Sequence, residues 1–273
     1  MKSKLIILTV LFLSSLFLQN INAHDASKHK KVEKNRNSKN QAHGHKGHHG
    51  YGRKSGPPSN IPEHIKGRIM KDGDWSVSGT AVNLNNSQVG IAGMEFMANF
   101  PALNEVKNMA LKTNNLGNEG VKILSQSKNF KWLERLSLWD NKITEEGAKM
   151  ISASKNFSNL KELNLNGNPI GNKGVVSLVK SGNLRNLTYL DLSATNISDE
   201  AALAIANSPY VSNLKRLDLF KNKIGPKGMK ALLQSKHLKS LEFLDGAHNN
   251  INSDEVISLE KSLKLPNMKT LVL

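Results

Sequence analysis

One pattern recurs every 27 residues along this chain, and it constrains the fold more than any other feature. In Leu133–Ile143, LERLSLWDNKI, leucines occupy the first, fourth and sixth places, asparagine the ninth and isoleucine the eleventh. Successive copies begin at Gly79, Val106, Leu133, Leu160, Leu187, Leu214 and Leu241, and Met268 opens an eighth copy that the C-terminus cuts short. A period of this length is typical of a chain that stacks copies of one unit around a continuous core.

Each copy is expected to contain a strand and a helix. The alternation at the fourth and sixth places predicts a short strand with one buried face, and stacked copies pair such strands in parallel about 4.8 Å apart. Apolar residues at the sixteenth and nineteenth places, such as Val121 and Leu124, share one face of a predicted helix. Glycines recur at the fifteenth place, where we expect them to allow close packing between neighbouring copies: Gly93, Gly120, Gly147, Gly174 and Gly228.

The asparagines at the ninth place are interpreted as scaffold rather than as a binding site. Where the chain turns away from the sheet, their amides can satisfy backbone groups that burial would otherwise leave unpaired. The column consists of Asn114, Asn141, Asn168, Asn222 and Asn249.

The pattern L-x-x-L-x-L-x-x-N-x-L resembles that of the leucine-rich repeat family, from about Gly79 to Leu273. The departures are Ser87 and Thr195 in place of asparagine, Gly246 in place of a sixth-place leucine, and Gly79 in place of the first. The length and the helical second half are most similar to the ribonuclease-inhibitor type. The resemblance implies an α/β solenoid, a right-handed β-α superhelix with a curved parallel sheet on its concave face and helices on its convex face. It also implies protein binding as the usual function.

Function is therefore sought on the outward strand positions, the third, fifth, seventh and eighth of each copy. Aromatic residues and arginines, the usual components of interface hot spots, gather there. Three aspartates also stand side by side, and their charges repel unless a cation or a basic group neutralises them. We considered a calcium site, a carboxylate dyad, a basic ligand, and pairing with Arg216 and Lys215. The candidate partner-binding residues are Arg135, Trp139, Asp140, Glu162, Tyr189, Asp191, Arg216, Asp218, Phe220, Phe243 and Asp245.

We do not expect an enzyme. No Ser-His-Asp or paired-glutamate arrangement accompanies the aspartates, and no G-x-x-x-x-G-K-[ST] loop is present. The chain has no cysteine, which excludes thiol catalysis, a lipoprotein anchor and the cysteine-rich caps common in animal extracellular leucine-rich repeats.

The N-terminus predicts export. Residues 1–23 begin with Lys2 and Lys4, continue with the apolar run Leu5–Leu18 and end at Ala23, as a cleaved signal peptide does. An uncleaved anchor is the alternative, although the run is short for a membrane span. Together with the lack of cysteine, this favours a bacterial periplasmic or secreted protein.

Residues 24–74 are interpreted as a disordered basic tail that precedes a repeat domain at 75–273, because they contain few apolar groups. Residues 24–71 carry twelve basic and three acidic side chains within a chain of net charge +16. His43, His45, His48 and His49 predict weak binding of zinc, copper or nickel, with a solvated tail as the alternative; no other cofactor is expected. The basic residues suggest contact with an anionic surface. The single aromatic, Tyr51, argues against specific nucleic-acid binding.

We therefore predict an exported, non-enzymatic leucine-rich-repeat module that binds a protein or peptide on its concave face. The alternatives are a periplasmic metal-binding protein that works through its histidine-rich tail, and a secreted effector or virulence factor. Trp75 is expected to cover the open N-terminal end of the core. The final apolar strand, Leu271–Leu273, offers an open sheet edge, and pairing of such edges between copies of the chain predicts a homo-oligomer.

Overall fold

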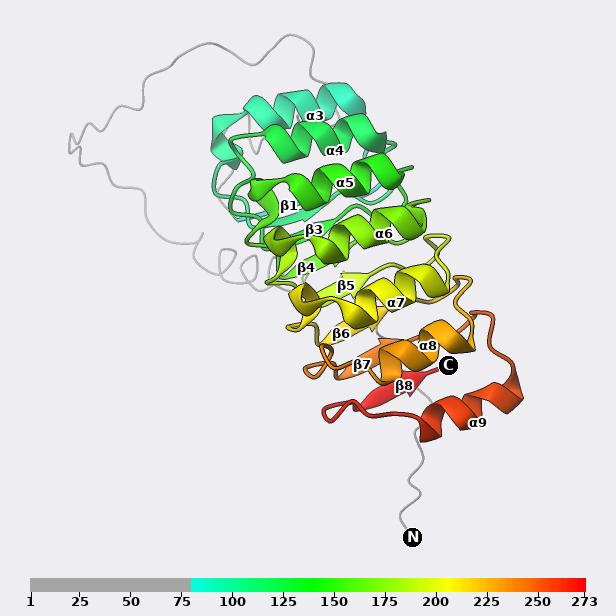
Figure 1. Cartoon of the computed structure of the whole chain (residues 1–273). Coiled ribbons are helices and arrows are strands. Elements are labelled where there is room, and N and C mark those ends of the chain that lie inside the picture. Colours follow the sequence, from blue (N-terminus) through cyan, green and yellow to red (C-terminus); the bar gives the residue numbers. More distant parts are fainter. Residues whose placement is uncertain (1–79) are drawn as a thin grey trace, which may run out of the picture. The chain divides into compact units, whose positions relative to one another are not determined.

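The computed structural model describes residues 80–273, where eight short strands alternate with seven α-helices (Figure 1). The strands are β1 (Ala81–Asn83), β2 (Asn108–Ala110), β3 (Arg135–Ser137), β4 (Glu162–Asn164), β5 (Tyr189–Asp191), β6 (Arg216–Asp218), β7 (Phe243–Asp245) and β8 (Thr270–Val272). The helices are α3 (Gly90–Asn99), α4 (Gly117–Gln126), α5 (Glu145–Ala153), α6 (Gly171–Lys180), α7 (Asp199–Asn207), α8 (Pro226–Leu233) and α9 (Ser253–Lys261). Four 3₁₀ turns follow helices: η2 (Pro101–Leu103), η3 (Lys155–Phe157), η4 (Gly182–Leu184) and η5 (Pro209–Val211).

The sheet runs β1 to β8 in chain order, with every neighbouring pair parallel. Each residue pairs with the residue 27 positions later, as in Arg135 with Glu162. The register of the sheet is therefore the sequence period itself. Neighbouring strands lie about 4.8 Å apart, whereas packed helices need about 8–10 Å, so the stack curves with the sheet on its concave side. This confirms the predicted α/β solenoid.

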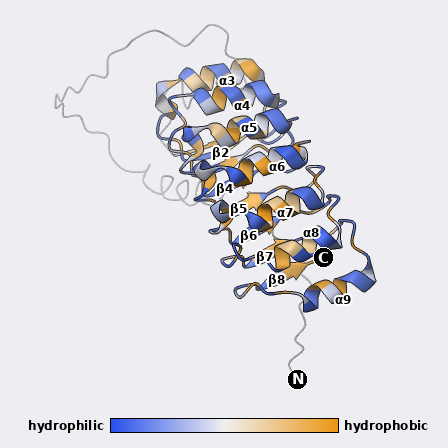
Figure 2. Ribbon diagram, in the orientation of Figure 1, coloured by the Kyte–Doolittle hydropathy of each residue, from blue (hydrophilic) through white to orange (hydrophobic). Residues whose placement is uncertain are grey.

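The core lies between the sheet and the row of helices. Leucines at the fourth and sixth places, such as Leu136 and Leu138, are fully buried against helix residues such as Ala148 and Ile151. Figure 2 shows hydrophobic and hydrophilic residues alternating along the helices, as expected when one face of each packs inward. Within residues 80–273, no helix is long and apolar enough to cross a membrane.

The asparagine column forms the predicted ladder. Asn168 is fully buried, and its Oδ1 accepts hydrogen bonds from the backbone nitrogens of Asn141 and Ile143 at 2.9 Å each. Its Nδ2 donates to the carbonyls of Leu138 and Leu165, also at 2.9 Å. We call each 27-residue copy of the solenoid a coil. One asparagine side chain thus joins two successive coils and satisfies backbone groups that would otherwise be buried without partners.

A second ladder, of serines at the twenty-second place, was not anticipated. The Ser154 hydroxyl donates to the carbonyl of Ser125 in the preceding coil at 2.8 Å and accepts from the backbone nitrogen of Asn156 at 3.2 Å. The same arrangement recurs at Ser127, Ser181, Ser208 and Ser235. Side chains at two turns of each coil therefore tie it to its neighbour.

Several helices receive their N-terminal cap from the preceding coil. The Asn118 Oδ1 accepts from the backbone nitrogens of Thr144 and Gly147, at the start of α5. Asp199 does the same for Gly225 and Gly228 at the start of α8. These contacts satisfy helix N–H groups that have no partner within the helix.

Two glycines, one that follows the repeat pattern and one that departs from it, have steric causes. A Cβ on Gly228 would lie 2.9 Å from the Cα of Asp199, so the expected packing role of the fifteenth-place glycine is confirmed there. A Cβ on Gly246 would lie 2.4 Å from the terminal methyl of Met229. The methionine of the preceding coil therefore fills the space that a sixth-place leucine normally takes.

Several sequence predictions lie outside the described residues. They are the signal peptide at 1–23, the tail at 24–74 with its four histidines, Trp75, and the first place of the first copy, Gly79.

Candidate functional site

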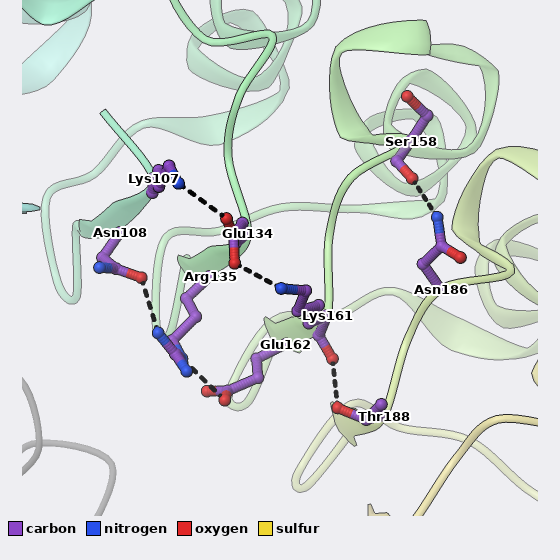
Figure 3. A network of polar contacts seen from close by, with 9 residues as sticks. All are labelled: Lys107, Asn108, Glu134, Arg135, Ser158, Lys161, Glu162, Asn186 and Thr188. Carbon is purple, nitrogen blue, oxygen red and sulfur yellow. Dashed lines mark hydrogen bonds and ion pairs between the residues drawn. The ribbon is translucent and has the colours of Figure 1, made fainter. Parts of the chain in front are cut away.

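The third-place side chains form one row across the concave strands, and this row divides into two parts. In the first part, Arg135 on β3 donates from Nε to the Glu162 Oε1 at 2.8 Å and from Nη1 to the Asn108 Oδ1 at 3.1 Å (Figure 3). These partners come from the strands on either side, β4 and β2. Arg135 and Glu162, both predicted site residues, are therefore engaged with each other in the free chain.

A parallel row of charges lies one residue earlier, where the strands begin. Glu134 accepts from Lys161 at 2.6 Å and from Lys107 at 3.4 Å (Figure 3). The hydrogen bond from Lys161 holds the pKa of Glu134 below its usual range. Because these lysines are about half exposed, the pairs contribute little stability. The two lysines and Glu134 together keep a net charge of +1.

Trp139 on the concave side is half-buried and lies under a cation. The Lys112 Nζ is 3.5 Å from the centroid of the Trp139 ring, within the range of a cation–π contact. The indole also borders Gly167, where a Cβ would approach Trp139 Cδ1 to 3.3 Å. Asp140, the next predicted site residue, is exposed and accepts a long hydrogen bond of 3.4 Å from the Thr113 hydroxyl.

The second part of the row, formed by Tyr189, Arg216 and Phe243, is the most organised group on this face. The Arg216 guanidinium lies 3.9 Å from the centroid of the Phe243 ring and 5.4 Å from that of Tyr189. Its Nε donates to the Asp218 Oδ2 at 3.0 Å, and the Tyr189 hydroxyl donates to the same oxygen at 2.9 Å. Asp218 thus orients both neighbours. We refer to Tyr189, Arg216, Asp218 and Phe243 as the arginine cluster.

Burial and charge act against each other inside the arginine cluster. Burial of Arg216 lowers the pKa of its guanidinium, but the neighbouring Asp218 carboxylate raises it by more, so the pKa lies above its ordinary value. Burial raises the pKa of Asp218, although Arg216 lowers it in part. Burial also raises the pKa of Tyr189, with Asp191 acting in the same direction. Arg216 therefore stays charged and Tyr189 stays a hydrogen-bond donor at physiological pH.

The fifth-place residues differ from expectation, because most of them are covered. Asp191 and Asp218 are only 5% and 6% exposed, and Ser137 and Asn164 are similarly buried. Asp191 accepts from the backbone nitrogen of Ser193 at 2.9 Å and from the Asn164 Nδ2 at 2.9 Å. Asp191 and Asp218 lie on the concave face as predicted, but they are buried and not accessible to a partner as expected. At Asp218, the bulkier third-place side chains of Tyr189 and Arg216 both contact the carboxylate.

All three aspartates of the row have pKa values above the usual range for this side chain. Burial raises the pKa of Asp191 from 3.8 to about 6, and the neighbouring Asp218 charge adds to this. Burial also raises the pKa of the half-buried Asp245. Within residues 80–273, no group of three or more His, Cys, Asp or Glu side chains is placed to hold a metal ion, so the calcium alternative receives no support.

Phe220, the last predicted aromatic, contacts the eighth-place His248 of the next coil. Their ring centroids lie 4.8 Å apart at an interplanar angle of 63°, an edge-to-face arrangement. Phe220 is half-buried and His248 is exposed. This pair extends the aromatic surface from the arginine cluster toward the ends of the strands.

Two exposed aromatics were missed in the sequence. Trp132 is 51% exposed and Tyr210 is 42% exposed, and both lie in the segments that lead from a helix into the next strand. The sequence did mark both residues, because each replaces an asparagine that recurs at its place in other copies. Trp132 is at the twenty-seventh place, which other copies fill with Asn159, Asn186, Asn213 and Asn267. Tyr210 is at the twenty-fourth place, which other copies fill with Asn129, Asn156 and Asn183.

Comparison with known proteins defines the class of the repeats. The segments 131–152, 158–179, 183–206 and 212–233 match a family model described as leucine-rich repeat. The chain therefore contains leucine-rich repeats, a fold commonly used for protein binding.

Among solved structures, a leucine-rich repeat protein of Leptospira interrogans is similar to this chain. It is 26% identical, with a TM-score of 0.37. The alignment covers 62% of this chain and 38% of that protein. A search of curated proteins returned no match.

Proposed function

We propose that this chain is a non-enzymatic binding module that engages a protein or peptide ligand on its concave face, centred on the arginine cluster. The observation that supports this most is the state of Arg216. Its side chain is fixed by Asp218 and stacked on Phe243 before any ligand is present. A long side chain that is already ordered loses little conformational freedom when it binds, so its contacts count almost fully toward affinity.

The chemistry of the surroundings agrees with this role. Arginine, tyrosine and tryptophan dominate interface hot spots, and here Trp139, Tyr189, Arg216, Phe220 and Phe243 lie along one sheet face. The four aromatic side chains are half-buried, and the surface that they leave exposed is largely apolar. Flat aromatic surface beside a fixed cation suits an extended or helical peptide segment better than a small polar metabolite.

The experiment is an affinity capture with the full-length chain and a matched pair of double variants. Arg216→Ala with Phe243→Ala removes the centre of the arginine cluster. Lys230→Ala with Ile257→Ala removes a cation and a large apolar side chain from exposed positions on helices α8 and α9, off the concave face. The first variant is expected to lose a specific partner that the second retains, with both showing the wild-type circular dichroism spectrum. Equal recovery by the two variants would contradict the proposal.

We propose further that the chain is exported and acts in the periplasm or outside the cell. The support is the composition of residues 1–23, which lie outside the described residues. N-terminal sequencing of the protein recovered from the producing cell tests this, with His24 expected as the first residue. Metal binding by His43, His45, His48 and His49 remains a prediction. Calorimetric titration of the full chain with zinc tests it, and an affinity in the millimolar range would exclude a metal-handling role.

A further inference from the structure

The positive charge of the repeats is concentrated on one edge of the solenoid. This edge consists of the seven segments that lead from each helix into the next strand (Figure 1), and we call it the basic flank. It comprises residues 101–107, 128–134, 155–161, 182–188, 209–215, 236–242 and 263–269.

The basic flank carries eleven basic side chains and three acidic ones. The basic residues are Lys107, Lys128, Lys131, Lys155, Lys161, Arg185, Lys215, Lys236, Lys239, Lys264 and Lys269, and the acidic ones are Glu105, Glu134 and Glu242. The other described residues carry thirteen basic and fourteen acidic side chains. The whole positive excess of residues 80–273 therefore lies on this one edge.

Internal pairing neutralises only part of this charge. Among the described residues, Lys107 and Lys161 share Glu134, and Lys269 pairs with Glu242 at 2.5 Å. The remaining eight cations form no ion pair with another described residue, and all of them are exposed. Because like charges repel, such a concentration is unfavourable for the free chain and is relieved by an anionic partner.

Within residues 80–273, the two most exposed aromatic side chains lie on the same flank. Trp132 is 51% exposed, with the Lys131 Nζ at 5.6 Å from its ring centroid, and Tyr210 is 42% exposed. Each interrupts a column of asparagines, as described above. Exposed tryptophan and tyrosine beside lysines are the side chains that settle at the headgroup level of a bilayer, with the ring in the apolar boundary and the cation on phosphate.

The spacing of the aromatics argues against a nucleic acid. Trp132 precedes β3 and Tyr210 precedes β6, so three strand spacings, about 15 Å, separate them along the sheet. Successive bases of a single strand stack on aromatic rings that are much closer together. A broad anionic surface can instead meet both aromatics and the whole series of lysines at once. We propose that the basic flank lies against a membrane surface rich in anionic lipid, which leaves the concave face open for its protein ligand.

The test uses the full-length chain and vesicles of phosphatidylcholine with or without phosphatidylglycerol. Lys128→Gln, Lys131→Gln and Lys155→Gln together remove three charges from the flank. Lys173→Gln, Lys227→Gln and Lys230→Gln together remove three exposed charges from helices α6 and α8, and serve as the control. The N-terminal tail is identical in both. At roughly fivefold per charge, the flank variant is expected to lose about 100-fold in partition onto anionic vesicles, whereas the control changes little. An equal loss in both variants, or no loss in the flank variant, overturns the proposal.

A second comparison separates a membrane from other polyanions. Trp132→Ala with Tyr210→Ala is expected to weaken binding to the anionic vesicles several-fold and to leave binding to duplex DNA unchanged. If this variant binds vesicles as wild type does, or if the wild-type chain binds DNA more tightly than vesicles at equal phosphate concentration, the membrane assignment is wrong.

Discussion

Replacing Asn168 with alanine should destabilise the repeats far more than its size suggests. The side chain accepts from two backbone nitrogens and donates to two backbone carbonyls, all near 2.9 Å, and it is fully buried. Each buried donor left without a partner costs about 1–3 kcal/mol. The two donors alone therefore predict a loss of about 2–6 kcal/mol in the free energy of unfolding. A domain of this kind has only about 5–15 kcal/mol in total.

Urea unfolding followed by far-ultraviolet circular dichroism measures this loss. Asn166→Ala is the matched control, because Asn166 lies two residues away and is only half-buried. The one hydrogen bond of its side chain is long, to Asp191 Oδ2 at 3.5 Å. The control should lose less than about 1 kcal/mol. If Asn168→Ala loses no more than Asn166→Ala, the asparagine column is not the scaffold described here.

Three further predictions follow from particular contacts. The pKa of Asp191 is raised to about 6 in the fold, so the folded state binds more protons than the unfolded state between pH 4 and 6. The stability of the fold should therefore fall as pH rises through that range. In urea unfolding at a series of pH values, Asp191→Asn should flatten this dependence. Thr113 has a φ of 53°, a backbone conformation that strains a β-branched residue. Thr113→Gly should therefore raise the free energy of unfolding by about 0.5–1 kcal/mol, seen as a higher thermal midpoint. A lower midpoint would exclude that strain. Gly228→Ala should lose about 1–3 kcal/mol because its Cβ meets the Asp199 backbone, and an unchanged urea midpoint would show that the coils can separate there.

The fold could be predicted in detail because one period governs every level of the structure. The residues that define the repeat in sequence also define the sheet register, since Leu136 pairs with Leu163, one 27-residue period later in the chain. The ninth-place asparagines were assigned correctly for the same reason. Their backbone partners recur in every coil, so one physical argument about Asn141 or Asn168 applies along the whole column.

The candidate site was less predictable, because it depends on how neighbouring coils cover one another. Alternation places Asp191 and Asp218 on the concave side, but it does not reveal that both are buried there, or that Tyr189 reaches Asp218 from the neighbouring strand. The fixed geometry of Arg216 arises from three strands together and has no signature within one repeat. The serines at the twenty-second place were visible as a column, yet a polar column in a loop is easily taken for solvent-exposed surface.

The most direct test of a concave binding surface is site-specific photo-crosslinking in the full-length chain. A photoreactive amino acid in place of Phe243, beside Arg216, should capture the ligand in a single specific adduct. The same amino acid at Lys230, exposed on helix α8, should give none. Adducts formed only at position 230 would place the ligand on the convex helices and contradict the assignment.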